Sequence, residues 1–172
     1  YELDGEPALD IYKKYLGEKA KDLPASGLLF PFQLLKTNHD SMGIVRTILG
    51  VDEKDKSVTL AGDIPQNCFV RLMHTNNEGL VDGAKSAAKS ALGNMNENNK
   101  TSDSLGILIS CVGRKLVMGT DIEDELDAVR DIFGKSTITG FYSYGEICPL
   151  DKFSECKLHN QTMTITYIRE SA

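Results

Sequence analysis

The chain has 172 residues, of which 41% are hydrophobic and 26% are charged, and its formal net charge is −6. This length and composition are typical of one globular domain with a core of its own. The acidic balance argues against a nucleic-acid or anionic membrane surface, because phosphate binding needs clustered Lys and Arg. No apolar run approaches the roughly 20 residues that a membrane-spanning helix needs.

The start of the chain, YELDGEPALD, is acidic and lacks the apolar centre of a signal peptide. It also lacks an initiator Met, so we expect a piece of a longer protein. We expect a cytoplasmic location, reduced cysteines, and neither nucleic acid nor membrane among the partners. A disulfide between Cys148 and Cys156 is the alternative for the thiols.

Motifs that would indicate catalysis or metal binding are missing. The four cysteines form no C-x-x-C pair, and with three histidines they give no zinc-finger spacing. There is no P-loop, no G-x-G-x-x-G, no G-x-S-x-G and no H-E-x-x-H. The sequence therefore predicts a protein that is not an enzyme and holds no metal.

The first 35 residues predict one helix and one weak strand. Residues 7–16 carry an apolar stripe at helical spacing, and Gly17 suits the end of that helix. Residues 19–27 are expected to form a linker. Residues 28–35 are apolar but contain Pro31, which predicts an edge strand or an extended loop.

A β-hairpin is predicted next. Residues 43–50 alternate as a strand does, VDEKDK supplies a turn, and residues 57–61 return. Residues 68–74 are expected to form another strand.

The following segment predicts a helix and a buried strand. Residues 76–95 carry many alanines on one side, which is typical of a helix packed closely on a sheet. Residues 94–103 are polar and predict a mobile loop. Residues 105–112 are almost continuously apolar, as in a central strand covered on both faces.

The last third predicts one helix and two strands. Thr120 and Glu123 have the spacing of a capping box, and Gly134 suits the end of the helix that they would open. Residues 137–147 and 157–169 are expected to be strands. The whole order predicts an α+β fold: a single domain with a mixed, mostly antiparallel sheet packed with about three helices.

One face of the strand 137–147 resembles a ligand platform. The strand period of two places Tyr142, Tyr144 and Glu146 together, beside glycines. Tyr offers a flat apolar body with a polar tip, Glu can pair with an amine, and Gly permits close approach. A solvated face with packed tyrosines is the alternative.

The strand 157–169 has polar residues at the start of its core face. His159 and Gln161 precede Met163 and two further apolar residues on that face. Buried polar groups cost free energy unless they are hydrogen-bonded. A structural network, contact with a ligand, and haem or metal ligation by His159 are the three interpretations.

Three arginines are candidates for binding an anion. Arg46 and Arg71 lie on apolar strand faces, where each is a buried anion partner or a residue whose charge reaches the surface. Arg114 follows the central strand, where ligands favour the crevice in open α/β sheets, or else it is a surface residue. Cys111 would be a nucleophile only with a base beside it, and no Cys/His spacing supports that role.

Several phrases together resemble the C-terminal half of the FIST ("F-box and intracellular signal transduction") sensory domain. They are YELDGEPALDIYKKYLG, GIVRTILGVDEKDKSVTLAGDIPQNCFVRLM, SCVGRKLVMG, GFYSYGEI and LHNQTMT. Each phrase alone is weak, but their order and spacing are specific and cover nearly the whole chain. The resemblance implies that an N-terminal half of the domain is absent from this chain. The matching positions are Arg46, Asp63, Arg71, Cys111, Gly113, Arg114, Tyr142, Tyr144, Glu146, His159, Asn160 and Gln161.

The resemblance implies a non-catalytic module of bacterial signalling proteins that binds a small ligand such as an amino acid. Its expected partners are the N-terminal half and a signalling output domain or kinase. In this hypothesis Arg46, Arg71 or Arg114 holds the ligand carboxylate and Glu146 holds the amine. No cofactor is expected. The alternatives are a haem-based nitric-oxide sensor with His159 as axial ligand, and a ligand-free interaction or dimerisation module.

Overall fold

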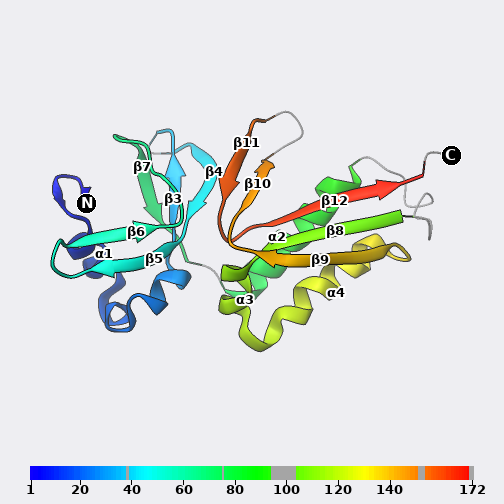
Figure 1. The fold of residues 1–172 in the computed structure, drawn as a ribbon, viewed down its shortest axis with the longest axis horizontal. Coiled ribbons are helices and arrows are strands. Elements are labelled where there is room, and N and C mark those ends of the chain that lie inside the picture. Colours follow the sequence, from blue (N-terminus) through cyan, green and yellow to red (C-terminus); the bar gives the residue numbers. More distant parts are fainter. Residues whose placement is uncertain (38, 75, 94–103, 151–153, 171–172) are drawn as a thin grey trace. The chain divides into compact units, whose positions relative to one another are not determined.

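A computed structural model describes residues 1–37, 39–74, 76–93, 104–150 and 154–170 (Figure 1). The chain divides into two compact units. Unit 1 comprises residues 1–75 with 158–160, and unit 2 comprises residues 76–157 with 161–172. The mobile loop predicted over residues 94–103 lies outside the described residues. No helix in the described part of the chain is long and apolar enough to cross a membrane.

Unit 1 begins with a two-residue hairpin and a helix. Strands β1 (Glu2–Leu3) and β2 (Glu6–Pro7) pair antiparallel, and α1 (Ala8–Leu16) follows and ends at Gly17 as predicted. The predicted linker is wrong, because it contains two 3₁₀-helices, Gly17–Asp22 and Ala25–Leu29.

The prediction of an edge strand or loop around Pro31 is also wrong. Strand β3 (Phe32–Leu35) begins directly after the proline and is the middle strand of a sheet. It pairs antiparallel with β4 (Ser41–Arg46) on one side and β7 (Phe69–Leu72) on the other. Pro31 lies before the ladder, so its missing N–H breaks no strand pairing.

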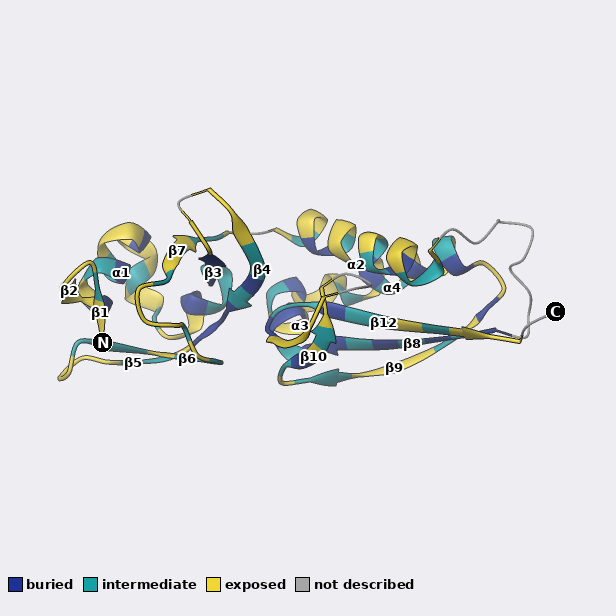
Figure 2. Cartoon of the chain, turned by 90° about the horizontal axis from the view of Figure 1, so that it is seen from above, coloured by how far each residue is buried: buried dark blue, intermediate teal, exposed yellow. Residues whose placement is uncertain are grey.

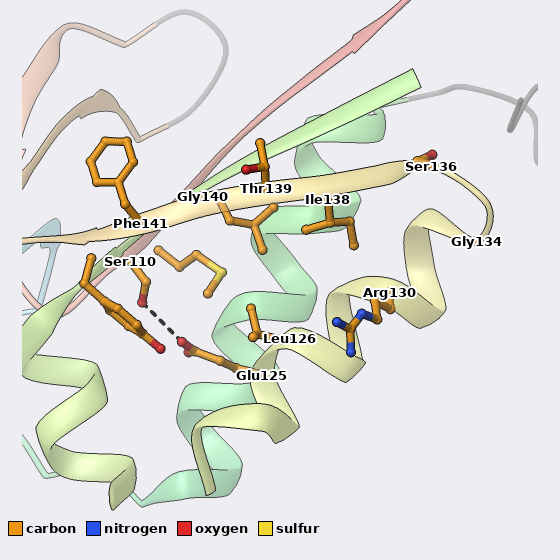
Figure 3. Close-up of a pocket in the computed structure, with 13 residues that line it drawn as sticks. Ser110, Glu125, Leu126, Arg130, Gly134, Ser136, Ile138, Thr139, Gly140 and Phe141 are labelled. Atoms are coloured by element: carbon orange, nitrogen blue, oxygen red, sulfur yellow. Dashed lines mark hydrogen bonds between the residues drawn. The ribbon is translucent and has the colours of Figure 1, made fainter. Parts of the chain in front are cut away.

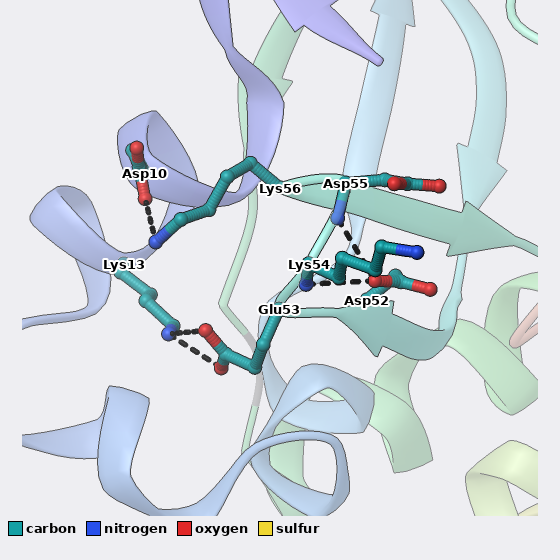
Figure 4. Close-up of polar contacts among 7 residues, drawn as sticks. All are labelled: Asp10, Lys13, Asp52, Glu53, Lys54, Asp55 and Lys56. Carbon is teal, nitrogen blue, oxygen red and sulfur yellow. Dashed lines mark hydrogen bonds and ion pairs between the residues drawn. The ribbon is translucent and has the colours of Figure 1, made fainter.

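The predicted strand 43–50 is divided in two. It ends as β4 at Arg46 and resumes as β5 (Ile48–Asp52), so Thr47 separates two sheets. The predicted hairpin is confirmed, since β5 pairs antiparallel with β6 (Ser57–Leu60). At its turn the Asp52 carboxylate accepts hydrogen bonds from the backbone N–H groups of Lys54 and Asp55 (Figure 4).

Helix α1 packs against this hairpin over the core of unit 1. Tyr12 is 1% exposed, its ring meets Phe32 edge-on at 5.3 Å, and its hydroxyl donates to the Phe30 carbonyl. At the surface, Lys13 pairs with Glu53 at 2.6 Å and Lys56 with Asp10 at 3.1 Å (Figure 4). Burial supplies most of the stability of this contact, because exposed ion pairs contribute little.

Unit 2 is a three-stranded sheet covered by helices. Strand β8 (Ser104–Cys111) is central, antiparallel to β12 (Met163–Arg169) and parallel to β9 (Thr137–Ser143). Helices α2 (Asn77–Leu92) and α4 (Ile122–Phe133) lie on one side of it (Figure 2). The core between these layers consists of Ala84, Ala88, Leu108, Val129, Phe133 and Met163.

The prediction that β8 is covered on both faces is wrong for the described residues of unit 2. Burial alternates along the strand, so only the face toward the helices is fully buried. On the other face Phe141 of β9 is 62% exposed and Ile168 of β12 is 50% exposed. Strand pairing on both edges places β8 in the centre, but helices cover only one side.

Short elements connect the sheet to its helices. Helix α3 (Val112–Met118) follows β8 directly, and a 3₁₀ turn (Gly119–Asp121) leads into α4, which ends at Gly134 as predicted. The predicted capping box is wrong. The N-cap is Asp121 without a side-chain cap bond, and the Thr120 hydroxyl donates to the Asp121 carboxylate instead.

The last two predicted strands are both interrupted. The first ends as β9 at Ser143, and β10 (Glu146–Pro149) begins beyond a two-residue break. The second divides into β11 (Cys156–His159), which pairs with β10, and β12. Gln161 lies between them with φ 55°, which no regular strand residue adopts. The α+β class with mostly antiparallel pairs is confirmed, but several small sheets replace the one predicted sheet.

Candidate functional site

A cavity of about 460 Å³ lies in unit 2 between helix α4 and strand β9 (Figure 3). Small-ligand sites are typically concave, mainly apolar and of about 300–1,000 Å³, with a few polar groups. Its lining residues are Leu108, Ser110, Glu125, Leu126, Arg130, Gly134, Ser136, Ile138, Thr139, Gly140, Phe141, Tyr142 and Met163.

Gly140 of the edge strand β9 lines the cavity. Gly140 pairs with Leu108 of β8, and a Cβ built on Gly140 would lie 1.9 Å from the Leu108 carbonyl oxygen. A backbone atom cannot move aside as a side chain can, so no side chain fits there. At Gly140 the β9 wall of the cavity therefore consists of backbone alone.

Buried polar side chains form one end of the cavity. Glu125 is completely buried, and its Oε2 accepts from Arg114 Nε at 3.1 Å and from Nη2 at 2.7 Å. Its Oε1 accepts from the Ser110 hydroxyl at 3.2 Å. Arg114 is 4% exposed and also donates to the Leu80 carbonyl. A carboxylate accepts about four hydrogen bonds, so Glu125 can accept one more beside these three.

Tyr142 completes the polar end. Its side chain is half-buried, and Lys115 Nζ lies 4.8 Å from the centre of its ring. Burial raises the pKa of the Tyr142 hydroxyl, and the negative charge of Glu125 raises it further. The hydroxyl therefore stays protonated and can donate a hydrogen bond into the cavity.

Arg130 lies at the rim of the cavity (Figure 3). It pairs with Asp127 at 2.8 Å, and both side chains are 65% exposed. Exposed pairs of this kind are weak, so the guanidinium can exchange its partner at little cost. The cavity thus has a buried carboxylate at one end, and at its rim an arginine that can leave its ion pair for another partner.

The predicted ligand platform is not a continuous strand face. Tyr142 lines the cavity, but Tyr144 lies in the break after β9 and is 90% exposed. Glu146 opens β10, is 3% exposed, and accepts hydrogen bonds from the hydroxyls of Ser143 and Thr162. The two-residue break therefore separates the three residues that strand periodicity had placed together.

Cys111 lies at the end of β8 and is 5% exposed. Burial raises the pKa of its thiol, partly offset by the backbone N–H groups of Gln161 and Gly113. Gln161 is half-buried, and its side chain lies 3.2 Å from where a Cβ on Gly113 would stand. A protonated, buried thiol is a poor nucleophile.

Five of the remaining predicted residues belong to unit 1, Arg71 among them. Arg46 is 7% exposed, and its described hydrogen bonds go to the carbonyl oxygens of Asp63, Val45 and Leu158. Burial lowers its pKa, and the exposed carboxylate of Asp63 raises it. His159 is 2% exposed and Asn160 1% exposed, with the Asn160 amide donating to the His159 carbonyl.

The structure therefore distinguishes the three arginines. Arg114 is bound to an internal carboxylate, Arg46 is buried against carbonyl oxygens, and Arg71 is exposed on β7, where it pairs with Gln33. His159 and Gln161, predicted on one core face, fall on either side of the turn that ends β11. His159 and Asn160 belong to unit 1 and Gln161 to unit 2.

Sequence reasoning missed Glu125 and Ser110. Both could have been found, because each interrupts an apolar pattern. Glu125 shares a helical stripe with Ile122 and Val129, and Ser110 follows Leu108 on the buried strand face. A charged residue on a core stripe is almost never fully buried without a partner.

The described residues contain no group of three His, Cys, Asp or Glu side chains that could hold a metal ion. His159 does not line the α4–β9 cavity or the groove of unit 1 described below. All four cysteines lie in the described part of the chain and none forms a disulfide there, so the alternative Cys148–Cys156 bond is not present in the structure.

Comparison with curated proteins found no match, and comparison with solved structures found none. The family model described as the FIST C domain matches residues 8–149, which is most of the chain. The resemblance to this family is thereby confirmed, although the phrase LHNQTMT lies outside the matched residues. The chain therefore belongs to the FIST C domain family, a family of sensory domains in signal transduction.

Proposed function

We propose that this chain is the ligand-binding input part of a cytoplasmic, bacterial signalling protein and regulates a linked output domain or kinase. The observation that carries the proposal is the cavity between α4 and β9. Its apolar walls end at a buried carboxylate, a serine hydroxyl and a tyrosine hydroxyl. No catalytic step is part of the proposal.

The ligand class that suits this cavity is an amino acid with an apolar side chain. Its ammonium group would donate to Glu125 Oε1, which replaces Glu146 in the role that the sequence suggested. Its side chain would pack against Leu108, Ile138 and Met163, which line the cavity. Arg130 at the rim would supply positive charge for the carboxylate, in place of the arginines predicted from sequence.

A ligand regulates an output only through different affinities for two conformations. Strand β9 and helix α4 are suited to such a change. They form the cavity walls, and β9 pairs with only one neighbour in its sheet. Closure of β9 on a ligand would shift the edge of the sheet without unfolding the core.

Isothermal titration calorimetry and thermal unfolding with leucine and phenylalanine test the proposal. At about 100 times Kd, a bound amino acid should stabilise the fold by about 2.7 kcal/mol. Isocaproic and hydrocinnamic acids, which lack the amine, should bind at least about tenfold more weakly, because a charge-assisted hydrogen bond is lost.

Ile138→Phe should fill the cavity and abolish binding, with Ile107→Phe on the uncovered face of β8 as the matched control. Tyr142→Phe removes one hydroxyl and little volume, so it tests the polar end even where Ile138→Phe folds poorly. The proposal is wrong if no amino acid stabilises the folded protein, or if Tyr142→Phe and Ile138→Phe both bind as the original chain does.

The haem alternative lacks a comparable observation, because His159 is buried in unit 1 and lines neither described cavity. The ligand-free interaction alternative finds support in the open groove of unit 1.

A further inference from the structure

Unit 1 contains an open groove of about 1,020 Å³, separate from the amino-acid cavity proposed above. Its walls come from the β1–β2 hairpin, helix α1, the β5–β6 hairpin and the segment leading into β7. Its lining includes the aromatic residues Tyr12, Tyr15, Phe32 and Phe69 and the acidic residues Glu2, Asp4 and Asp63.

The groove combines an apolar base with exposed aromatic sides. Tyr12 and Phe32 at its base are 1% and 7% exposed and belong to the core of unit 1. At its sides Tyr15 is 73% exposed and Phe69 51% exposed. Aromatic side chains that are free on a surface are typical anchors of protein interfaces.

The charged residues of the groove all have one sign. Glu2, Asp4 and Asp63 are exposed and line it, whereas none of the described lining residues is Lys, Arg or His. Unit 1 does carry lysines, but none of them lines the groove. Lys13 and Lys56, for example, form ion pairs with Glu53 and Asp10 (Figure 4). The negative charge of the groove is therefore a local feature.

We infer that this groove binds a basic amphipathic peptide segment of a partner protein. The apolar face of the segment would lie on the base of the groove, and its Lys and Arg side chains would meet the acidic rim. Charge complementarity selects this occupant, because an acidic or uncharged segment would leave three carboxylates facing it without compensation. The inference does not depend on the amino-acid cavity of unit 2.

A fluorescently labelled peptide of Leu and Lys, with the Leu residues at helical spacing so that they share one face, is the probe. The same peptide with Glu in place of Lys is its control. Fluorescence anisotropy with the whole chain should show saturable binding of the basic peptide alone. Its affinity should fall steeply as salt rises, because exposed charges are screened.

Two pairs of matched variants localise the binding. Glu2→Gln/Asp4→Asn/Asp63→Asn should weaken binding at least about tenfold. Glu155→Gln/Asp131→Asn/Glu170→Gln changes the net charge equally outside the groove and should leave binding nearly unchanged. Tyr15→Ser should weaken binding, whereas the same change at Tyr144, a still more exposed tyrosine in unit 2, should not.

Equal weakening by both triple variants would mean that the peptide responds only to net charge, and the inference would be wrong. Binding of both peptides, or of neither, would overturn it as well. Loss of peptide binding would leave amino-acid binding in unit 2 untouched, so the two proposals fail separately.

Discussion

Glu125 shows how a single buried charge is tolerated. Its carboxylate is fully buried and receives two hydrogen bonds from Arg114 and one from Ser110. Desolvating both charges is expensive, so the pair is not a large net source of stability. Its value is that the two charges must stay together, which fixes α4, the helix of Glu125, relative to α3, the helix of Arg114.

Removal of one partner of this pair should therefore be costly. Glu125→Ala leaves the buried Arg114 charge without its carboxylate and should lower the free energy of unfolding by about 3–5 kcal/mol. Urea denaturation measures this. Arg114→Met/Glu125→Leu should cost clearly less than the single change, and Asp127→Ala, in an exposed pair, less than about 1 kcal/mol. A double variant as unstable as Glu125→Ala would contradict this account.

The thiol of Cys111 should be unreactive in the folded protein. Burial raises its pKa, so the reactive thiolate forms only at higher pH than in an ordinary cysteine. Iodoacetamide at about pH 8, near the ordinary thiol pKa, should modify the exposed Cys156 well before Cys111, as followed by peptide mass spectrometry. Labelling of Cys111 should accelerate as pH rises or as the chain unfolds. Equal rates for the two cysteines in the native state would refute the burial argument.

At the scale of elements, local sequence predicted where helices and hairpins form better than where strands stop. Gly17 and Gly134 end helices α1 and α4 as expected, and the β5–β6 hairpin is present. The breaks at residues 144–145 and 160–162 were missed. Alternation continues across both, so only the pairing partners on either side show that the strand has changed sheets.

Two strand glycines should respond in opposite ways to the same substitution. A Cβ on Gly106 of β8 would lie 2.5 Å from the Phe133 ring, which is completely buried. Gly106→Ala should therefore destabilise by about 1–3 kcal/mol. Gly50→Ala in β5 meets Thr59 at 3.9 Å, an ordinary contact, and should be neutral or slightly stabilising. Thermal or urea unfolding of the two variants checks the contrast, which would fail if both behaved alike.

For the whole molecule, the main feature is the presence of two separate cores. Tyr12, Phe32 and Ile48 belong to the core of unit 1, whereas Leu108 and Val129 belong to that of unit 2. The chain also returns to unit 1 late in the sequence, because residues 158–160 belong to unit 1 although both flanking segments belong to unit 2. The Arg46 hydrogen bond to the Leu158 carbonyl holds this returning segment.

Because the two units have separate cores, we expect each unit to unfold locally without the other. Val129→Ala should raise amide hydrogen exchange mainly in β8, β9 and α4, and Ile48→Ala mainly in β3, β5 and α1, because each cavity weakens its own core. Exchange followed by mass spectrometry distinguishes the two patterns. If both variants raised exchange equally throughout the chain, the two units would open as one, contrary to this prediction.

The sequence by itself determined the α+β class, the order of most elements, the helix ends at Gly17 and Gly134, and the family. These features depend on neighbouring residues or on the order of short phrases. Only the tertiary structure decided which carboxylate Arg114 meets, where the last strands break, and that Tyr142 rather than Tyr144 lines a cavity. Each of those outcomes depends on contacts between residues far apart in the chain, such as Ser110 with Glu125 and Leu108 with Gly140, and strand periodicity carries no information about them.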